Sequence, residues 1–358
     1  VSGFLTQAEY DQYRGEALAL RAICYFDLMQ MYSKPYHMGN GANRGVPLRL
    51  TANKSAEGND MAPSTVAEVY TQILKDLNDA ESIAATNLGD DYLNITRIHK
   101  NTIIAFKTRV YMHMQNWGAV VTESAKIVPN AAPYTASSGV ANALNANYAG
   151  IFASPNTTKE SIFSLPNTAS NNAGTQNHLA HYFESGSDES YHVVQTAGSA
   201  FAAMDATDAR KVMMKTVGEK VYLTKYIDRA TRTDWSPVIR WAEVLLNRAE
   251  ALVRSGGTVD AQAVNLLNAV RTRSFATGAY NVSDFVNAQA FYDAVLLERN
   301  MEFLGEGIRN MDIMRLGLTI PGKDGGGFGS VAAIPSNAQA YFWPVPDSEL
   351  SYNKQMTP

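Results

Sequence analysis

Apolar positions recur at steps of three and four residues along the first third of the chain, which is the spacing of amphipathic helices. Residues 6–32 carry one such stripe, and Pro35 ends it. A second helix follows Ser64, whose hydroxyl is placed to cap it. Residues 99–128 predict a helix pair around a tight turn at 116–118. The first part of the chain is therefore predicted to consist of packed helical hairpins.

The first helix has a predicted core face. Its stripe consists of Ala17, Leu20, Arg21, Cys24, Leu28 and Met31, and Leu18, Ala22 and Tyr25 widen it. Cys24 is the only cysteine, so an intrachain disulfide and a multi-thiolate zinc site are excluded. A small thiol within an apolar helical pattern is predicted to be a buried packing residue.

Periodicity fades between residues 130 and 236. This stretch is rich in Asn, Ser, Thr, Gly and Ala, and only the short pieces 161–165 and 221–226 resemble strands. A structureless segment of this length is uncommon unless it has a function. We therefore expect a loop-rich layer that carries a ligand face.

Helical order returns at residue 237. Pro237 suits a first helical turn, because the amide hydrogen that proline lacks has no partner there. Gly256 and Gly257 break this helix, and Asp260 or Thr258 caps the next one. Further helices are predicted at 288–305 and 308–316.

The pattern as a whole predicts a mostly α fold, with helical hairpins of the tetratricopeptide (TPR) type and a loop-rich middle layer carrying short strands. We divide the chain into 1–129, 130–236 and 237–358, three parts of one intertwined domain. Hydrophobic residues make up 46% of the 358 residues, as in ordinary globular proteins. Because the chain does not begin with Met and runs at once into helix-like sequence, we expect a processed or truncated product.

Charge and motifs narrow the function. Thirty basic against 34 acidic residues give a net charge of −4, which disfavours nucleic-acid binding. No Gly-x-Ser-x-Gly elbow occurs, and residues 317–324 place an acid where a phosphate-binding loop needs Ser or Thr. His178, His181 and Glu184 lack the spacing of a zinc protease. The sequence predicts no enzyme, no cofactor and no metal.

Glu298, Glu302 and Glu306 follow one another at four-residue spacing on a predicted helix, with Arg299 and Arg315 nearby in the sequence. Paired carboxylates serve general acid–base catalysis in some enzymes. A row of like charges on one helix is also stabilised when arginines from neighbouring elements neutralise it. The pattern favours such a structural ion network.

Aromatic residues divide into two groups. Tyr111, Trp117 and Trp241 fall on helical stripes and are predicted to lie in the core. Others lie in polar, loop-like sequence, where a ring beside amides and guanidinium groups suits a flat, hydroxyl-rich ligand. The predicted ligand-binding residues are Tyr36, His37, Asn40, Arg44, Tyr182, Phe183, Tyr191 and Trp235.

A series of motifs resembles the SusD/RagB family. They occur in the family's order over residues 15–350: GEALALRAICYFDL (15–28), GVPL (45–48), STVAEVY (64–70), IRWAEVLLNRAEA (239–251), LNAVRTR (267–273), the Glu/Arg pattern of 298–315, and FWPVP (342–346) followed by EL (349–350). Each motif is weak alone, but the ordered set is specific. The motifs that match belong to the scaffold and do not encode the ligand.

The resemblance implies a function. Members are surface-exposed lipoproteins of the Bacteroidetes outer membrane that capture oligosaccharides and pass them uncleaved to a SusC-like TonB-dependent transporter. We expect the same here, with the lipid anchor outside this chain, since Cys24 lies within a helix. Two alternatives stay open: a peptide-capturing RagB-like lipoprotein, and a TPR-type adaptor that binds a protein partner.

Overall fold

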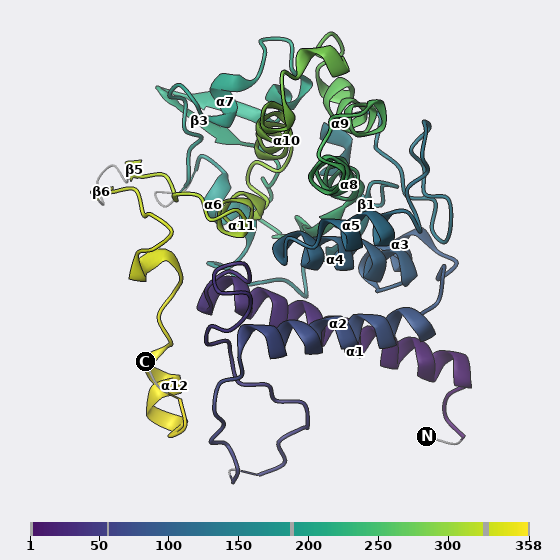
Figure 1. The fold of residues 1–358 in the computed structure, drawn as a ribbon, viewed down its shortest axis with the longest axis vertical. Helices are drawn as coiled ribbons and strands as arrows, with labels where there is room; N and C mark the ends of the chain where they lie inside the picture. The colour runs from purple at the N-terminus through teal and green to yellow at the C-terminus, as the bar shows by residue number, and fades with distance from the viewer. Residues whose placement is uncertain (1–2, 56, 187–189, 325–328, 357–358) are drawn as a thin grey trace. The chain divides into compact units, whose positions relative to one another are not determined.

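The computed structural model describes residues 3–55, 57–186, 190–324 and 329–356 (Figure 1). Most of its regular structure is helical. The helices are α1 (Gln7–Tyr32), α2 (Val66–Ile83), α3 (Asp91–Thr96), α4 (Lys100–His113), α5 (Trp117–Ser124), α6 (Leu179–Phe183), α7 (Ala200–Ala203), α8 (Trp241–Gly256), α9 (Ala261–Ser274), α10 (Ala288–Glu302), α11 (Ile308–Arg315) and α12 (Asp347–Tyr352). The strands are β1 (Ser161–Leu165), β2 (Met214–Val217), β3 (Lys220–Leu223), β4 (Ser236–Arg240), β5 (Lys323–Asp324) and β6 (Ser330–Val331). The predicted mostly α fold with short strands is confirmed.

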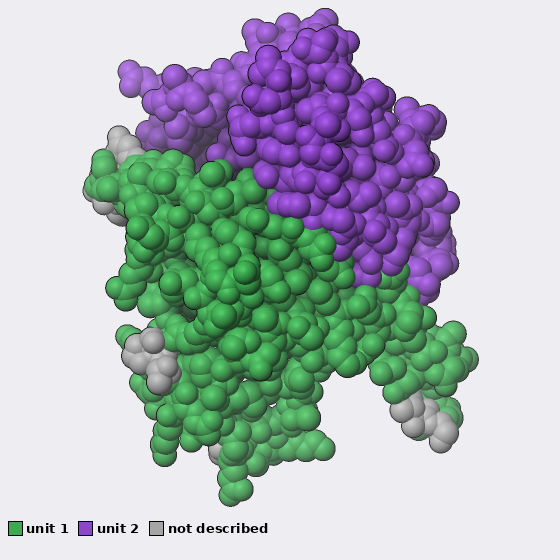
Figure 2. Space-filling view, in the orientation of Figure 1, with its two compact units in different colours: residues 1–83, 110–116, 310–358 green, residues 84–109, 117–309 purple. Residues whose placement is uncertain are grey.

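The chain forms two compact units (Figure 2). Unit 1 comprises residues 1–83, 110–116 and 310–358, and unit 2 comprises residues 84–109 and 117–309. The boundaries predicted after residues 129 and 236 divide the chain differently from these two units. They stay predictions.

In unit 1, α1 packs against α2. The face of α1 that is buried carries Ala19, Ala22, Ile23, Phe26 and Met29. The predicted stripe was wrong in part: Ala17, Leu20 and Cys24 are exposed, whereas Ala22 and Tyr25, which were predicted to widen it, are buried. Because α1 is apolar around much of its circumference, the spacing alone fits more than one face, and packing selects one of them.

The cap of α2 lies one residue later than predicted. The Thr65 hydroxyl accepts the backbone N–H of Glu68 at 3.2 Å, and the Glu68 carboxylate accepts the backbone N–H of Thr65 at 2.7 Å. This reciprocal pair is a capping box. Ser64 was the wrong residue, because its backbone already pairs with Gly45 and Val46 across the preceding loop.

The predicted helix pair at 99–128 is present as α4 and α5. The turn lies at residues 114–116, slightly earlier than predicted, and Trp117 begins α5. Trp241 is fully buried, as predicted, whereas Tyr111 and Trp117 are half-buried. The Arg254 guanidinium lies 4.8 Å from the centre of the Trp117 ring, so this ring covers a cation at the edge of the core.

In unit 2, β1 has the predicted bounds and pairs antiparallel with β4. Pro237 lies in β4 opposite Ser164, so its predicted place in a first helical turn was wrong, and α8 begins only at Trp241. A proline is tolerated in both settings because it needs no amide partner at a helix start or at a sheet edge. The two-stranded sheet provides that edge.

The remaining strands of unit 2 form a hairpin. β2 and β3 pair in register across a turn at Gly218. The strand predicted at 221–226 corresponds to β3, which begins one residue earlier and ends at Leu223. β2 and the short helices α6 and α7 were not predicted, because segments of four or five residues carry too little periodicity.

The centre of unit 2 is α8, which is buried over nearly its whole length and packs against α5, α9 and α10. Gly257 ends α8 in the left-handed conformation, with φ of +75°, and Asp260 caps α9 by accepting the backbone N–H of Ala263 at 2.8 Å. Both predictions are confirmed. Over the residues that the structure describes, no helix is both long and apolar enough to cross a membrane.

Candidate ligand-binding site

A buried ion network lies within unit 2. The Glu302 carboxylate accepts Arg240 at 3.0 Å and Arg273 at 2.5 Å. Glu306 accepts Arg240 at 2.8 Å and Lys225 at 2.7 Å. The predicted ion network is thus confirmed, but its cations come from β4, α9 and the segment after β3, which the spacing of the glutamates did not reveal.

Two further acids complete the network. Glu160, directly before β1, pairs with Arg273 at 2.9 Å and with Arg240. Glu298 pairs with Arg210 at 2.6 Å and with Arg271 at 2.9 Å. A buried charge is tolerated only when it is paired and hydrogen-bonded, and these acids meet that condition.

The network sets the protonation of its acids. Burial by itself would raise the pKa of Glu302, but Arg273, Arg240 and Arg210 outweigh burial and lower this pKa to about 2. In Glu306 the same balance, with Arg240 and Lys225 as the cations, also lowers the pKa. Both carboxylates are therefore ionised at neutral pH and serve as acceptors within the scaffold.

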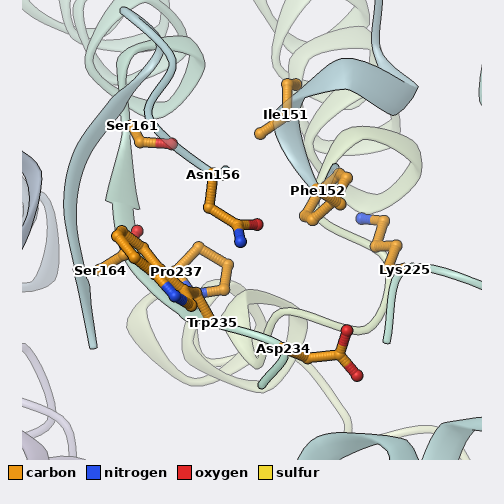
Figure 3. Close-up of a pocket in the computed structure, with 9 residues that line it drawn as sticks. All are labelled: Ile151, Phe152, Asn156, Ser161, Ser164, Lys225, Asp234, Trp235 and Pro237. Atoms are coloured by element: carbon orange, nitrogen blue, oxygen red, sulfur yellow. The ribbon is translucent and has the colours of Figure 1, made fainter. Parts of the chain in front are cut away.

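Next to this network is a shallow hollow on unit 2 (Figure 3). It is lined by two apolar walls and a set of polar groups. The lining residues are Ile151, Phe152, Asn156, Ser161, Ser164, Lys225, Asp234, Trp235 and Pro237. The enclosed space holds one water molecule at most, so a larger ligand would contact its rim and the surrounding rings.

The polar groups of the hollow differ in chemistry. Asn156 projects its amide between the Trp235 and Phe152 walls, and the Lys225 ammonium points in from the Phe152 side (Figure 3). The Asp234 carboxylate accepts the backbone N–H of Asp228 at 2.8 Å, and burial raises the pKa of Asp234. The rim thus offers an amide and a carboxylate close to an indole ring, whereas the Lys225 ammonium is buried and paired with Glu306.

Trp235 is held in place by a second aromatic residue. Its ring meets the Tyr92 ring edge to face, with centroids 5.6 Å apart and planes at 78°. Tyr92 belongs to α3, which packs against β1. The indole is therefore half-buried and oriented before any ligand arrives.

Three other predicted ligand-binding residues gather around α6. The rings of Tyr182 and Tyr191 are stacked, with centroids 5.6 Å apart and planes at 16°, and Tyr191 is 62% exposed. Phe183 lies against Tyr191 and, at 5.4 Å, against the buried Tyr226. Tyr226 in turn lies 6.2 Å from Phe152, a wall of the hollow. An aromatic row therefore joins the tyrosine stack to the hollow.

The other four predicted residues belong to unit 1. Tyr36 packs edge to face on Tyr70 at 5.1 Å, and His37 is half-buried, which lowers its pKa. Asn40 is exposed with φ of +50°, and Arg44 forms a backbone bridge with Thr65. These residues stay predicted ligand contacts.

Sequence reasoning missed several groups of the hollow. Phe152, Asn156 and Asp234 lie in irregular stretches of the predicted loop layer, and Lys225 lies in a stretch that was predicted only as a strand. Asp234 precedes Trp235 directly, so a search of the sequence next to each predicted ring would have found it. No local signal links Tyr92 to Trp235.

The histidines after residue 177 form no metal centre. The rings of His178 and His181 lie 5.9 Å apart, in a tilted arrangement. Among the described residues, no group of three or more His, Cys, Asp or Glu side chains is arranged to hold a metal ion.

Comparison with known proteins identifies relatives of this fold. The model of the SusD family matches residues 168–358, and a model described as starch-binding and associating with the outer membrane matches residues 4–112. A curated relative, the SusD-like protein P38 of Formosa agariphila, is 31% identical over 121 residues. That stretch covers 33% of this chain and 21% of the relative.

Solved structures agree over nearly the whole chain. A SusD superfamily protein from Bacteroides fragilis superposes with a TM-score of 0.85 at 33% identity, covering 98% of this chain and 77% of that one. One from Bacteroides thetaiotaomicron has a TM-score of 0.79 at 23% identity, covering 99% and 80%. A laminarin-binding SusD-like protein has a TM-score of 0.69 at 20% identity, also covering 99% and 80%. The ordered motifs, the fold and these matches agree: the chain belongs to the SusD family.

Proposed function

We propose that this protein captures oligosaccharides on the aromatic surface of unit 2 and leaves them uncleaved. The observation that carries the proposal is the Trp235 hollow, where an indole wall is combined with the Asn156 amide and the Asp234 carboxylate. A sugar ring presents an apolar C–H face and a rim of hydroxyl groups. An aromatic wall beside mixed donors and acceptors suits both features.

An exposed tyrosine stack adds a second ring to this surface, although the Tyr226 ring between the two is buried. The stack of Tyr182 and Tyr191 presents a second ring, which is exposed, and the chain of rings through Tyr226 and Phe152 links it to the hollow. Binding along two ring sites favours an oligosaccharide over a single sugar. The description of the matching family model as starch-binding supports a glycan as well.

The number of carboxyl groups that line the hollow favours capture without cleavage. Glycosidases place two carboxyl groups across the bond that they break. Among the lining residues of the hollow, Asp234 is the single carboxylate. Glu302 and Glu306 are buried and engaged with arginines, so they are unavailable to a bound sugar.

The experiment is a titration of the intact protein with a panel of neutral and acidic oligosaccharides in a calorimeter, followed by chromatography of the recovered sugars. We expect saturable binding of at least one sugar and no shorter products. Absence of binding to every glycan, or the release of shorter sugars, would contradict the proposal. Length-dependent capture of peptides in their place would favour the peptide-binding alternative.

We further propose that the captured glycan is passed to a SusC-like TonB-dependent transporter, with this protein as a surface-exposed lipoprotein of the outer membrane. Family membership and the description "associating with outer membrane" support this step. Co-purification of the protein with a TonB-dependent barrel from outer membranes of the native host tests it. Isolation of the native protein free of any such barrel, under conditions that keep known complexes intact, would contradict it.

A further inference from the structure

Unit 1 contains a groove that the function proposed above does not use. It consists of two adjoining hollows of about 540 Å³ and about 360 Å³, which share Arg49 and Glu349 as lining residues. Cavities that bind small ligands have volumes of about 300–1,000 Å³. The groove is therefore large enough for a ligand of several sugar units.

The walls of the groove are tied together. The buried Asn353 amide donates to the Met61 carbonyl at 2.8 Å and accepts the Met61 backbone N–H at 2.8 Å. The Lys354 backbone N–H donates to the Asp60 carboxylate at 2.8 Å. These bonds join the loop before α2 to the segment after α12, so the groove is preformed by two segments far apart in the sequence.

The larger hollow is polar, and four charged side chains belong to its lining. Among the described residues, neither the Arg49 guanidinium nor the Lys354 ammonium forms an ion pair; the Arg49 guanidinium donates to the Asn59 carbonyl at 2.9 Å. The carboxylates of Asp60 and Glu349 lie in the same lining. Two cations and two carboxylates balance, so the lining carries no net charge that would attract an acidic ligand.

Aromatic surface borders both hollows. Tyr352 lines the larger one and is 83% exposed. Tyr32 lines the smaller one and meets the exposed Trp343 edge to face, with centroids 6.1 Å apart. The floor of the smaller hollow is apolar and includes Val46, Pro47 and Val345.

From this combination we infer a second saccharide-binding site in unit 1, for a neutral oligosaccharide. Exposed rings and an apolar floor suit the C–H faces of sugars, and the balanced set of Arg49, Lys354, Asp60 and Glu349 suits hydroxyl groups, which both donate and accept hydrogen bonds. A charge-balanced lining favours a neutral sugar over an acidic one. The inference rests on the proposed capture of glycans and adds a second place for it.

The test is calorimetric titration of the whole protein with laminarihexaose and maltohexaose as probes. The wild-type protein is expected to show two binding events with at least one probe. Tyr352→Ala weakens one event at least tenfold, and Lys354→Ala weakens the same event. Tyr10→Ala, an exposed tyrosine on α1 outside both linings, leaves both events unchanged and serves as the matched control.

The variants separate this inference from the proposed function. A single event that survives Tyr352→Ala and Lys354→Ala but weakens in Trp235→Ala overturns the second site and leaves the proposed function intact. A single event that weakens in Tyr352→Ala and survives Trp235→Ala supports the second site and removes the first. Heat with tryptic casein peptides but with neither sugar overturns the saccharide assignment. Far-ultraviolet circular dichroism identifies any variant that fails to fold.

Discussion

Two neighbouring regions of unit 2 use the same residue types for opposite purposes. In the ion network, the side chains of Arg240, Glu302 and Glu306 are buried, and Arg240 pairs with both carboxylates. In the hollow, Asn156 and Asp234 meet solvent beside an indole wall. Buried, paired charges stabilise the scaffold, whereas polar groups at a solvent-exposed rim can contact a ligand.

Lys225 belongs to both regions. Its ammonium pairs with Glu306 at 2.7 Å and also lines the hollow, where it lies 4.7 Å from the centre of the Phe152 ring. Burial lowers the pKa of Lys225, and Glu306 opposes that effect. The hollow is thus placed directly on a rigid network, which is how a binding surface keeps its shape before the ligand arrives.

Breaking the network gives the largest expected effect. Arg240→Met leaves Glu160, Glu302 and Glu306 with one cation fewer in a buried setting, and loss of one partner of a buried pair costs about 3–5 kcal/mol. Urea denaturation measures the free energy of unfolding. Lys75→Met, which removes a solvent-exposed pair with Asp79 on α2, is the control and should cost less. Equal losses would show that burial does not distinguish the two pairs.

A pH series tests how the burial of a single histidine affects the free energy of unfolding. Burial lowers the pKa of His99 to about 4 from an ordinary 6.5. As the pH falls, the unfolded chain therefore takes up this proton at a higher pH than the folded chain does. The free energy of unfolding declines by about 3 kcal/mol between pH 6.5 and pH 4. In His99→Gln this part of the decline should disappear. An identical pH dependence in both proteins would mean that His99 does not titrate between these limits.

Substitutions in the hollow are expected to lower the affinity for ligand and not to unfold the protein. Trp235→Ala is expected to weaken oligosaccharide binding by about 1–2 kcal/mol, since one stacking contact is lost, and Tyr182→Ala to weaken it similarly. Calorimetry measures the affinity, and the thermal transition should stay cooperative. Val286→Ala, a highly exposed side chain in unit 2, is the control. Unchanged affinity in both ring variants would remove these residues from the site.

The smallest expected effect is that of removing the N-terminal cap of α2 in unit 1. Thr65→Ala removes the cap of α2 and should cost about 1 kcal/mol of stability. Ser64→Ala keeps the backbone bonds to Gly45 and Val46 and should be nearly neutral. Chemical denaturation of the two variants provides the comparison. A larger loss of stability in Ser64→Ala than in Thr65→Ala would show that Ser64 is the capping residue.

Local chemistry in the sequence determined where most elements begin and end. The bounds of β1, the break at Gly257 and the cap at Asp260 all follow from residues within a few positions of the feature. Three glutamates at four-residue spacing likewise indicated an ion network before any partner was known. The ordered scaffold motifs also identified the family, because they encode the helical frame.

Only the tertiary structure decided which face and which partner each residue uses. Cys24 is exposed because α1 packs through Ala22 and Phe26, although its apolar spacing fits another face equally well. Pro237 lies in a strand because β1 provides a partner for it. The hollow combines Phe152, Lys225 and Trp235 from separate segments. Burial depends on the surface that a residue meets in three dimensions, and sequence spacing does not contain that surface.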